Sequence, residues 1–152
     1  MRVLTLRIIF TFLILFVLSS CGSQSVKDSG AHPRQIGYVE QEKPGALIIL
    51  TLTDSGRMIG GSILDAKAGM RENRFSITEE QFSFIWTSLN SPGISKYQFT
   101  PKKTDSMSNP KFYTISKISE AGDQSYRIPV ESGSPESERV IDALKAVIAS
   151  NS

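Results

Sequence analysis

The chain of 152 residues contains one cysteine and one histidine, and this scarcity limits the chemistry it can carry. The lone Cys21 cannot form a disulfide within the chain, so a folded domain must be held by its hydrophobic core. The lone His32 lies beside Pro33 in a polar segment that would not hold it in a catalytic geometry. These absences exclude Ser-His and Cys-His nucleophile arrangements and metal sites built from histidine and cysteine. We expect neither a metal ion nor another cofactor.

The first 20 residues have the three parts of an export signal. The parts are a positive start with Arg2 and Arg7, an apolar stretch over residues 8–18, and two small residues, Ser19 and Ser20. The apolar stretch is shorter than the roughly 20 residues that a membrane-spanning helix requires. We therefore expect residues 1–20 to be a signal peptide that is removed.

The run Leu18-Ser19-Ser20-Cys21 resembles the lipobox of bacterial lipoproteins, in which a leucine and two small residues precede a cysteine. In that family the thiol receives a diacylglycerol, the leader is cut before the cysteine, and the new amino group is usually acylated. The resemblance implies that Cys21 anchors the chain to a membrane, which two or three acyl chains do firmly. The alternative is an ordinary secretory signal with a chance cysteine after the cut.

The residues after the cysteine bear on location. In Gram-negative lipoproteins an aspartate at the next position often means retention in the inner membrane, and here Gly22 and Ser23 follow. The resemblance therefore implies a lipid-anchored protein of the cell envelope, on the outer membrane and facing the periplasm if the cell is Gram-negative.

An excess of one charge is also missing. The chain has 17 basic and 15 acidic residues, and two of the basic ones lie in the expected signal peptide. The mature chain would then carry 15 of each sign, with no long run of like charge. We expect no nucleic-acid partner, because such partners require a basic surface.

Composition divides the remaining chain in two. Residues 21–45 comprise the cysteine and a segment rich in serine, glycine, glutamine and charge, which predicts a flexible tether with a possible short strand over residues 35–39. Residues 46–152 predict a single globular domain, because about 130 residues without the leader suffice for one domain and not for two of ordinary size.

Hydrophobic periodicity predicts strands and two helices in this domain. Strands are expected over 46–52, 57–64, 96–99, 111–118 and 125–130, with a possible further strand between 69 and 77. Pro129 places the strand 125–130 at an edge of the sheet or with its free side there. The glycine pair at 60–61 suggests a bulge or a close approach of backbones.

The first helix is expected to start at Thr78, where Thr78 and Gln81 fit a capping box. Its apolar side chains share one face and predict a place in the core; they are Phe82, Ile85, Trp86 and Leu89. Phe84 lies off that face and could mark a contact surface. The second helix should begin at Ser134-Pro135. These elements predict an α+β fold, a two-layer domain in which both amphipathic helices cover one face of a mostly antiparallel sheet.

The polar stretch between Pro101 and Pro110 is the best sequence candidate for a recognition element. It lies between two expected strands, and loops on a rigid scaffold often carry function. Its candidate binding residues are Lys102, Lys103, Asp105, Met107 and Asn109. The alternative is a solvated and mobile hairpin loop.

A second possible site combines the glycine pair at 60–61 with the segment 67–74. There Arg71 and Arg74 could meet a carboxylate or a phosphate. The alternative is that these basic residues are ordinary surface residues.

Catalytic patterns are weak. Ser108 and Lys111 have the spacing of a serine–lysine pair, but Pro110 lies between them in an expected loop, so no helical turn would bring lysine to serine. Glu79 and Glu80 suit the first turn of a helix. We therefore expect no catalytic residues and no enzyme activity, but a lipid-anchored envelope protein that binds another protein or an envelope component. The alternatives are an envelope hydrolase with an unrecognised site, and an inhibitor or immunity-type lipoprotein.

Overall fold

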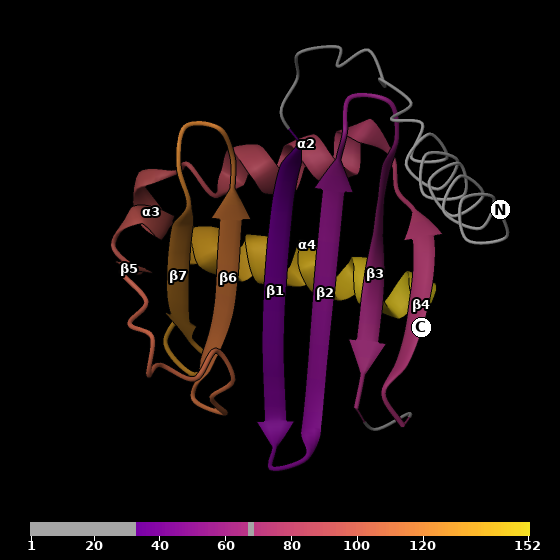
Figure 1. The fold of residues 1–152 in the computed structure, drawn as a ribbon. Coiled ribbons are helices and arrows are strands. Elements are labelled where there is room, and N and C mark those ends of the chain that lie inside the picture. The colour runs from indigo at the N-terminus through magenta and orange to yellow at the C-terminus, as the bar shows by residue number, and fades with distance from the viewer. Residues whose placement is uncertain (1–32, 67–68) are drawn as a thin grey trace, which may run out of the picture. The chain divides into compact units, whose positions relative to one another are not determined.

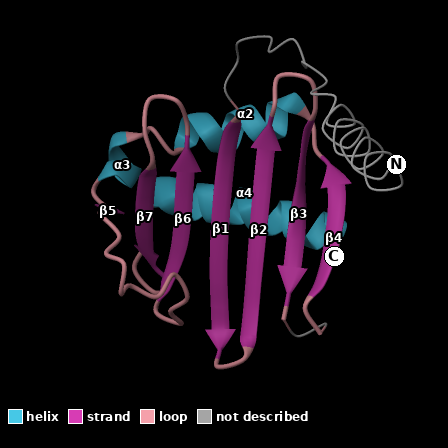
Figure 2. Ribbon diagram, in the orientation of Figure 1, coloured by secondary structure: helices cyan, strands magenta, loops and turns pink. Residues whose placement is uncertain are grey.

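Seven strands and three helices make up the part of the chain that the computed structural model describes, residues 33–66 and 69–152 (Figures 1 and 2). In chain order they are β1 (Arg34–Lys43), β2 (Ala46–Asp54), β3 (Ile59–Asp65), β4 (Arg71–Ser76), α2 (Glu79–Ser88), α3 (Pro92–Ser95), β5 (Gln98–Phe99), β6 (Phe112–Ile118), β7 (Gln124–Pro129) and α4 (Pro135–Asn151). The expected signal peptide, Cys21 and the first part of the expected tether lie outside the described residues.

The strands form one antiparallel sheet in the order β4-β3-β2-β1-β6-β7-β5. The sheet and its helices confirm the α+β class, and β4 confirms the possible strand between residues 69 and 77. β7 lies one strand from the edge. The outer strand β5 pairs with its first residues, Ser125 and Tyr126, and Pro129 lies beyond that pairing, as expected for a residue without a backbone donor.

The centre of the sheet corrects the expected start of the domain. Residues 34–43 were expected in the tether apart from a short strand, but they form β1, which pairs with β2 on one side and β6 on the other. A tight turn leads into β2 through Gly45, whose φ of 82° suits glycine. The hydrophobic residues that alternate along β1, Ile36 and Tyr38, are fully buried. The globular domain therefore begins near residue 33.

Buried side chains of the strands and helices form a single hydrophobic cluster. Register places the buried strand residues on one face: Tyr38 lies opposite Leu50 on β2 and Ile115 on β6. In Figure 1, α2 and α4 cross the strands on the side away from the viewer. Their contributions to the cluster are Phe82, Ile85, Leu89, Val140, Ile141, Leu144, Val147 and Ile148.

The two helices that the sequence predicted, α2 and α4, start at the expected residues. The Thr78 side chain accepts a hydrogen bond from the backbone N–H of Gln81, and the Gln81 side chain accepts one from the backbone N–H of Thr78. This reciprocal capping box satisfies two donors that the helix leaves free. At the second helix, Ser134 caps the N-terminus through the backbone N–H of Ser137.

The glycine pair in β3 marks a close approach of backbones and not a bulge, because β3 keeps a regular register with β2 and β4. A Cβ atom on Gly61 would lie 2.4 Å from the carbonyl oxygen of Thr51, and one on Gly60 would lie 2.7 Å from that of Phe75. Neither position leaves room for a side chain.

Candidate functional site

The polar stretch 101–110 does not form a hairpin. β5 and β6 both pair with β7 and lie on opposite sides of it, so residues 100–111 must cross from one side of β7 to the other. Arg127 on β7 holds this connection: its Nη2 donates to the carbonyl oxygen of Ser106 at 3.1 Å, and its guanidinium stacks 4.3 Å from the centre of the Phe99 ring.

This connection lies on the sheet face that points away from the core. Thr114, directly opposite Arg127, is only 1% exposed, and Ser125 on the same face is also buried. Hydroxyl groups on a solvated face would not be buried to this degree, so we infer that the connection packs over β6 and β7. Of the alternative, a solvated hairpin loop, only the hairpin is wrong, because most residues of this connection are exposed.

The candidate residues of this connection differ in their roles. Lys102, Lys103 and Met107 are exposed. Asp105 and Asn109 are partly buried and hold local turns: Asp105 accepts the backbone N–H of Lys102 at 2.9 Å, and Asn109 accepts that of Lys111 at 2.9 Å. The exposed members thus present two cations and a thioether on an ordered loop.

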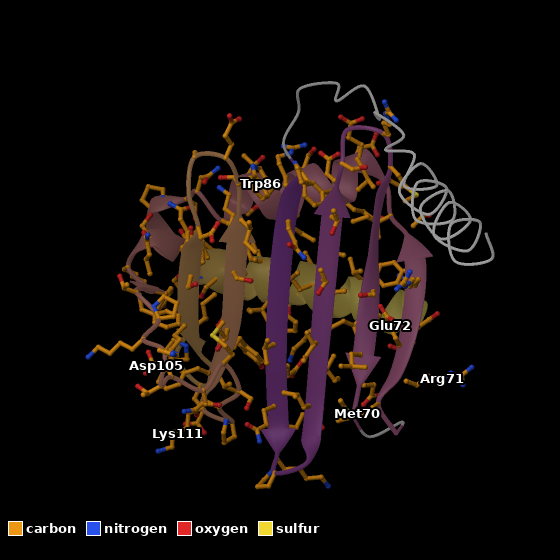
Figure 3. All side chains as sticks on the ribbon, viewed as in Figure 1. Met70, Arg71, Glu72, Trp86, Asp105 and Lys111 are labelled. Carbon is orange, nitrogen blue, oxygen red and sulfur yellow. The ribbon has the colours of Figure 1, made fainter. Side chains whose placement is uncertain are left out.

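The second possible site forms a shallow groove on the same outer face, over β2, β3 and β4. Its volume is about 560 Å³, and its lining includes Gly60, Gly61, Arg74 and the residues Thr51, Thr53, Ser62 and Ser76. Arg74 is largely exposed and contacts Glu72 at 3.3 Å. Arg71 does not line the groove. Figure 3 places Asp105 and Arg71 near opposite edges of the sheet, so the two sequence candidates do not form one site.

Trp86 is partly exposed, which corrects its expected place in the core. Its ring stacks on the buried Phe82 with centroids 5.8 Å apart, and two cations lie over it: Lys117 Nζ at 4.4 Å and the Arg34 guanidinium at 5.4 Å. Burial, and then the nearby Arg34 charge, lower the pKa of Lys117. Helical spacing placed Trp86 on the correct side of α2 but could not show that cations from β1 and β6 would cover it.

Arg34 is fixed by a carboxylate of the neighbouring strand. It binds Asp54 through both Nε and Nη2, and the Asp54 carboxylate also accepts the backbone N–H of Gly56 at 2.8 Å. The hydrogen bonds from Arg34, followed by that from Gly56, lower the pKa of Asp54. The Asp54 carboxylate binds both Arg34 and the backbone of Gly56, so this cluster connects the start of β1 to the end of β2.

The closest approach to a catalytic constellation is a cluster of four polar groups beneath α4. Lys145 Nζ lies 3.2 Å from Glu40 and 3.0 Å from the Tyr113 hydroxyl, while the buried Tyr38 donates to Glu40 at 3.0 Å. A small pocket of about 130 Å³ lies beside Lys145 and Tyr113.

The protonation behaviour of this cluster does not suit acid–base catalysis. Burial, and then the Glu40 charge, raise the pKa of Tyr38. Burial alone would lower the pKa of Lys145, but hydrogen bonds to Tyr113 and Glu40 outweigh it and raise that pKa. A general acid or base works best when its pKa lies near the ambient pH, and both groups move away from neutrality. The cluster therefore resembles a structural ion-pair network.

Metal ligands do not gather in the part of the chain that the structure describes, since no group of three or more histidine, cysteine, aspartate or glutamate side chains could hold an ion there. Within residues 33–66 and 69–152, none of the helices has the length and apolarity needed to cross a membrane.

An apolar groove lies between α2 and α4, and this site was only partly visible in the sequence. Its volume is about 360 Å³, and it is lined by Glu80, Gln81, Phe84, Ile85, Ala143, Ala146, Val147 and Ser150. Phe84 is 52% exposed, in line with the expectation that it would lie off the buried face. A large aromatic side chain exposed beside an apolar groove is typical of a contact surface.

The α4 wall of the groove was missed because its residues are small. Ala143, Ala146 and Ser150 follow one another along the helix at spacings of three and four, beside the predicted apolar stripe. Such residues give a weak hydrophobic signal, but they leave the space that Phe84 borders. The spacing itself could have identified them, because residues three and four apart share a helical face.

Comparison with known proteins gives no family: no protein-family model matches the sequence, and neither the curated proteins nor the solved structures contain a significant match.

Proposed function

We propose that this chain is a lipid-anchored protein of the cell envelope whose two-layer α+β domain binds another protein without catalysing a reaction. The lipid on Cys21 would hold the domain at the membrane, at the outer membrane in a Gram-negative cell. In the two-layer arrangement α2 and α4 cover one face of the sheet, and the groove between them is the binding surface.

The observation that carries this proposal is the exposure of Phe84 in an apolar groove. Burying apolar surface stabilises a protein or a complex by about 25 cal/mol for each Å², and an exposed aromatic side chain does not gain this free energy until a partner covers it. Aromatic residues in central, well-packed pockets supply much of the binding energy of protein interfaces. Phe84 is not part of the buried core cluster, so core packing does not account for a large aromatic side chain at this position.

The competing enzyme hypothesis has less support. Its best cluster, Glu40 with Lys145 and the two tyrosines, has the pKa shifts of a structural network. The adjoining pocket of about 130 Å³ is much smaller than the 300–1,000 Å³ that is typical of small-molecule sites.

Site-specific photocrosslinking in living cells tests the proposal. A photoreactive amino acid at position 84 should give one dominant crosslinked envelope protein, and that protein should bind the purified chain directly. The matched control places the same amino acid at position 123, in the exposed turn between β6 and β7. Absence of a crosslink at position 84, or equal crosslinks at both positions, would contradict a binding site between α2 and α4.

A further inference from the structure

The strand β4 forms one edge of the sheet, and among residues 33–66 and 69–152 no strand pairs with its outer side. It is the longer of the two edge strands, with six residues against two in β5, and five of its six residues are exposed. Figure 3 shows Arg71 and Glu72 at this edge. An edge strand presents a row of unpaired backbone N–H and C=O groups that another strand can bind. β4 is therefore a candidate surface for strand pairing.

The hydrogen bonds of the neighbouring strands determine which backbone groups of β4 are free. The N–H of Ala66 donates to the carbonyl oxygen of Leu47 at 2.9 Å and continues the register between β3 and β2. Because hydrogen-bonded pairs alternate along an antiparallel ladder, the even-numbered residues of β3 bond to β2 and the odd-numbered ones bond to β4. The register between β3 and β4 then leaves the backbone groups of Glu72 and Arg74 pointing outward.

A second copy of the chain could pair with this edge in antiparallel orientation about a two-fold axis. Outward-pointing groups must meet outward-pointing groups, so the axis passes through a residue and not between two residues. An axis at Glu72 or at Arg74 would set two like charges directly opposite each other, which is unfavourable. An axis at Asn73 sets Glu72 of each copy opposite Arg74 of the other. Symmetry makes this favourable pair twice, so the charges select one register.

The same register gives suitable contacts on the other face of the strand. Arg71 of one copy lies opposite Phe75 of the other. Arg71 is exposed and Phe75 is partly exposed, so the guanidinium can cover the aromatic ring. Asn73 donates a hydrogen bond to the carbonyl oxygen of Asn151 at the C-terminal end of α4. The two Arg71 residues flank this point on the same face, where cations favour the negative end of a helix.

We propose that the chain forms a two-fold symmetric dimer in which β4 pairs with β4 of a second copy, with Asn73 at the axis. The sheet then continues across the interface through backbone hydrogen bonds at the two pairs of Glu72 and Arg74. Charged side chains on an edge strand discourage pairing with foreign strands, and here they complement each other only in this self-pairing. The inference goes beyond the proposed function and does not rest on it, because β4 does not line the groove between α2 and α4.

Disulfide formation in membranes of cells that produce the full chain tests the dimer. Asn73 opposes itself in a pair without backbone hydrogen bonds, where Cα atoms lie about 4.5 Å apart, so Asn73→Cys should give a disulfide-linked dimer with copper phenanthroline as oxidant. Ser76→Cys is the matched control on the same strand. Ser76 would oppose Met70, so the two Ser76 residues would lie about 20 Å apart, too far for a disulfide. The wild-type chain, which contains only Cys21, gives the background.

Charge reversal tests the register. In the Asn73→Cys chain, Glu72→Arg or Arg74→Glu alone places like charges opposite each other at both symmetric positions. Each change should lower the disulfide-linked fraction by about fivefold or more. The two changes together restore opposite charges in both pairs and should restore the disulfide-linked fraction. Circular dichroism of each purified variant establishes that it is folded.

Several results would overturn the dimer: no disulfide at position 73 above the wild-type background, equal disulfide formation at positions 73 and 76, or a disulfide at position 73 that neither single charge reversal weakens. A double variant that stays as weak as the single variants would also contradict the proposed register. The binding function of the groove is judged separately, by the crosslink at position 84.

Discussion

Replacing Gly61 with alanine should destabilise the domain, because this position joins three neighbouring strands without space for a side chain. The new Cβ would lie 2.4 Å from the Thr51 carbonyl oxygen, 2.8 Å from Cδ2 of Leu52 and 3.1 Å from Cζ of Phe75. The nearest of these atoms belongs to the backbone of β2, so it cannot move away by a side-chain rotation. The sheet must therefore shift locally.

The expected size follows from two opposing effects. Overpacking costs typically about 1–3 kcal/mol, and alanine restricts the unfolded chain, which returns about 0.4–1 kcal/mol. Taking the middle of each range, the net loss should be about 1.3 kcal/mol. Urea unfolding followed by the fluorescence of Trp86, the single tryptophan, should then show a midpoint lower by roughly 0.5–1 M.

Gly93→Ala is the matched control. The three atoms nearest to its Cβ would all belong to the side chain of Glu136, with Oε2 at 2.7 Å, and that flexible side chain can rotate away. Its unfolding free energy should stay within about 0.5 kcal/mol of the wild type. Equal urea midpoints for Gly61→Ala and Gly93→Ala would refute the close approach of β2 and β3.

Three further changes test other parts of the account. Cys21→Ser should prevent lipidation and release of the leader, and normal maturation and membrane retention of that variant would contradict the anchor. Trp86→Ala should cost about 1–3 kcal/mol by urea unfolding followed with circular dichroism, less than a fully buried aromatic, because the ring is only partly buried; a loss above 4 kcal/mol would place the ring in the core. Asp54→Asn should lower the unfolding free energy at pH 7 by about 1–3 kcal/mol. Because the folded pKa of Asp54 is lowered, the stability that its carboxylate provides is present above about pH 4 and is lost as the pH falls through the folded pKa. The unfolding free energies of the variant and the wild type should therefore converge in acid. A difference in unfolding free energy that does not change with pH would contradict this role.

The sequence predicted elements well where local signals were strong. The capping box at Thr78 and the stripe of α4 depend on residues within one or two helical turns, and both are present in the structure. Strands with β-branched residues, such as β2, were found for the same reason. Local propensity and pattern agree at these positions.

Long-range contacts were not predictable in the same way. β1 looked like a tether because of its flanking prolines and glycines, and it becomes the central strand through pairing with β6, which lies more than 70 residues later. The crossing of residues 100–111 over β7 depends on strand order, which no local pattern encodes. The cations over Trp86 come from β1 and β6 for the same reason.

The candidate binding surface was predicted only in part. Phe84 was identified as a possible contact residue from its place off the apolar stripe, but the groove also needs α4 to lie beside α2. That juxtaposition of two helices separated by three strands is a property of the sheet topology.

The most direct test of the binding function is the affinity of the crosslinked partner for the wild-type chain and for Phe84→Ser, measured with purified proteins. Phe84 is 52% exposed, so this change should leave the urea midpoint almost unaltered. If Phe84 is a central contact, its loss should weaken binding by about 2 kcal/mol or more, roughly 30-fold. An unchanged affinity of the folded variant would contradict a binding site between α2 and α4.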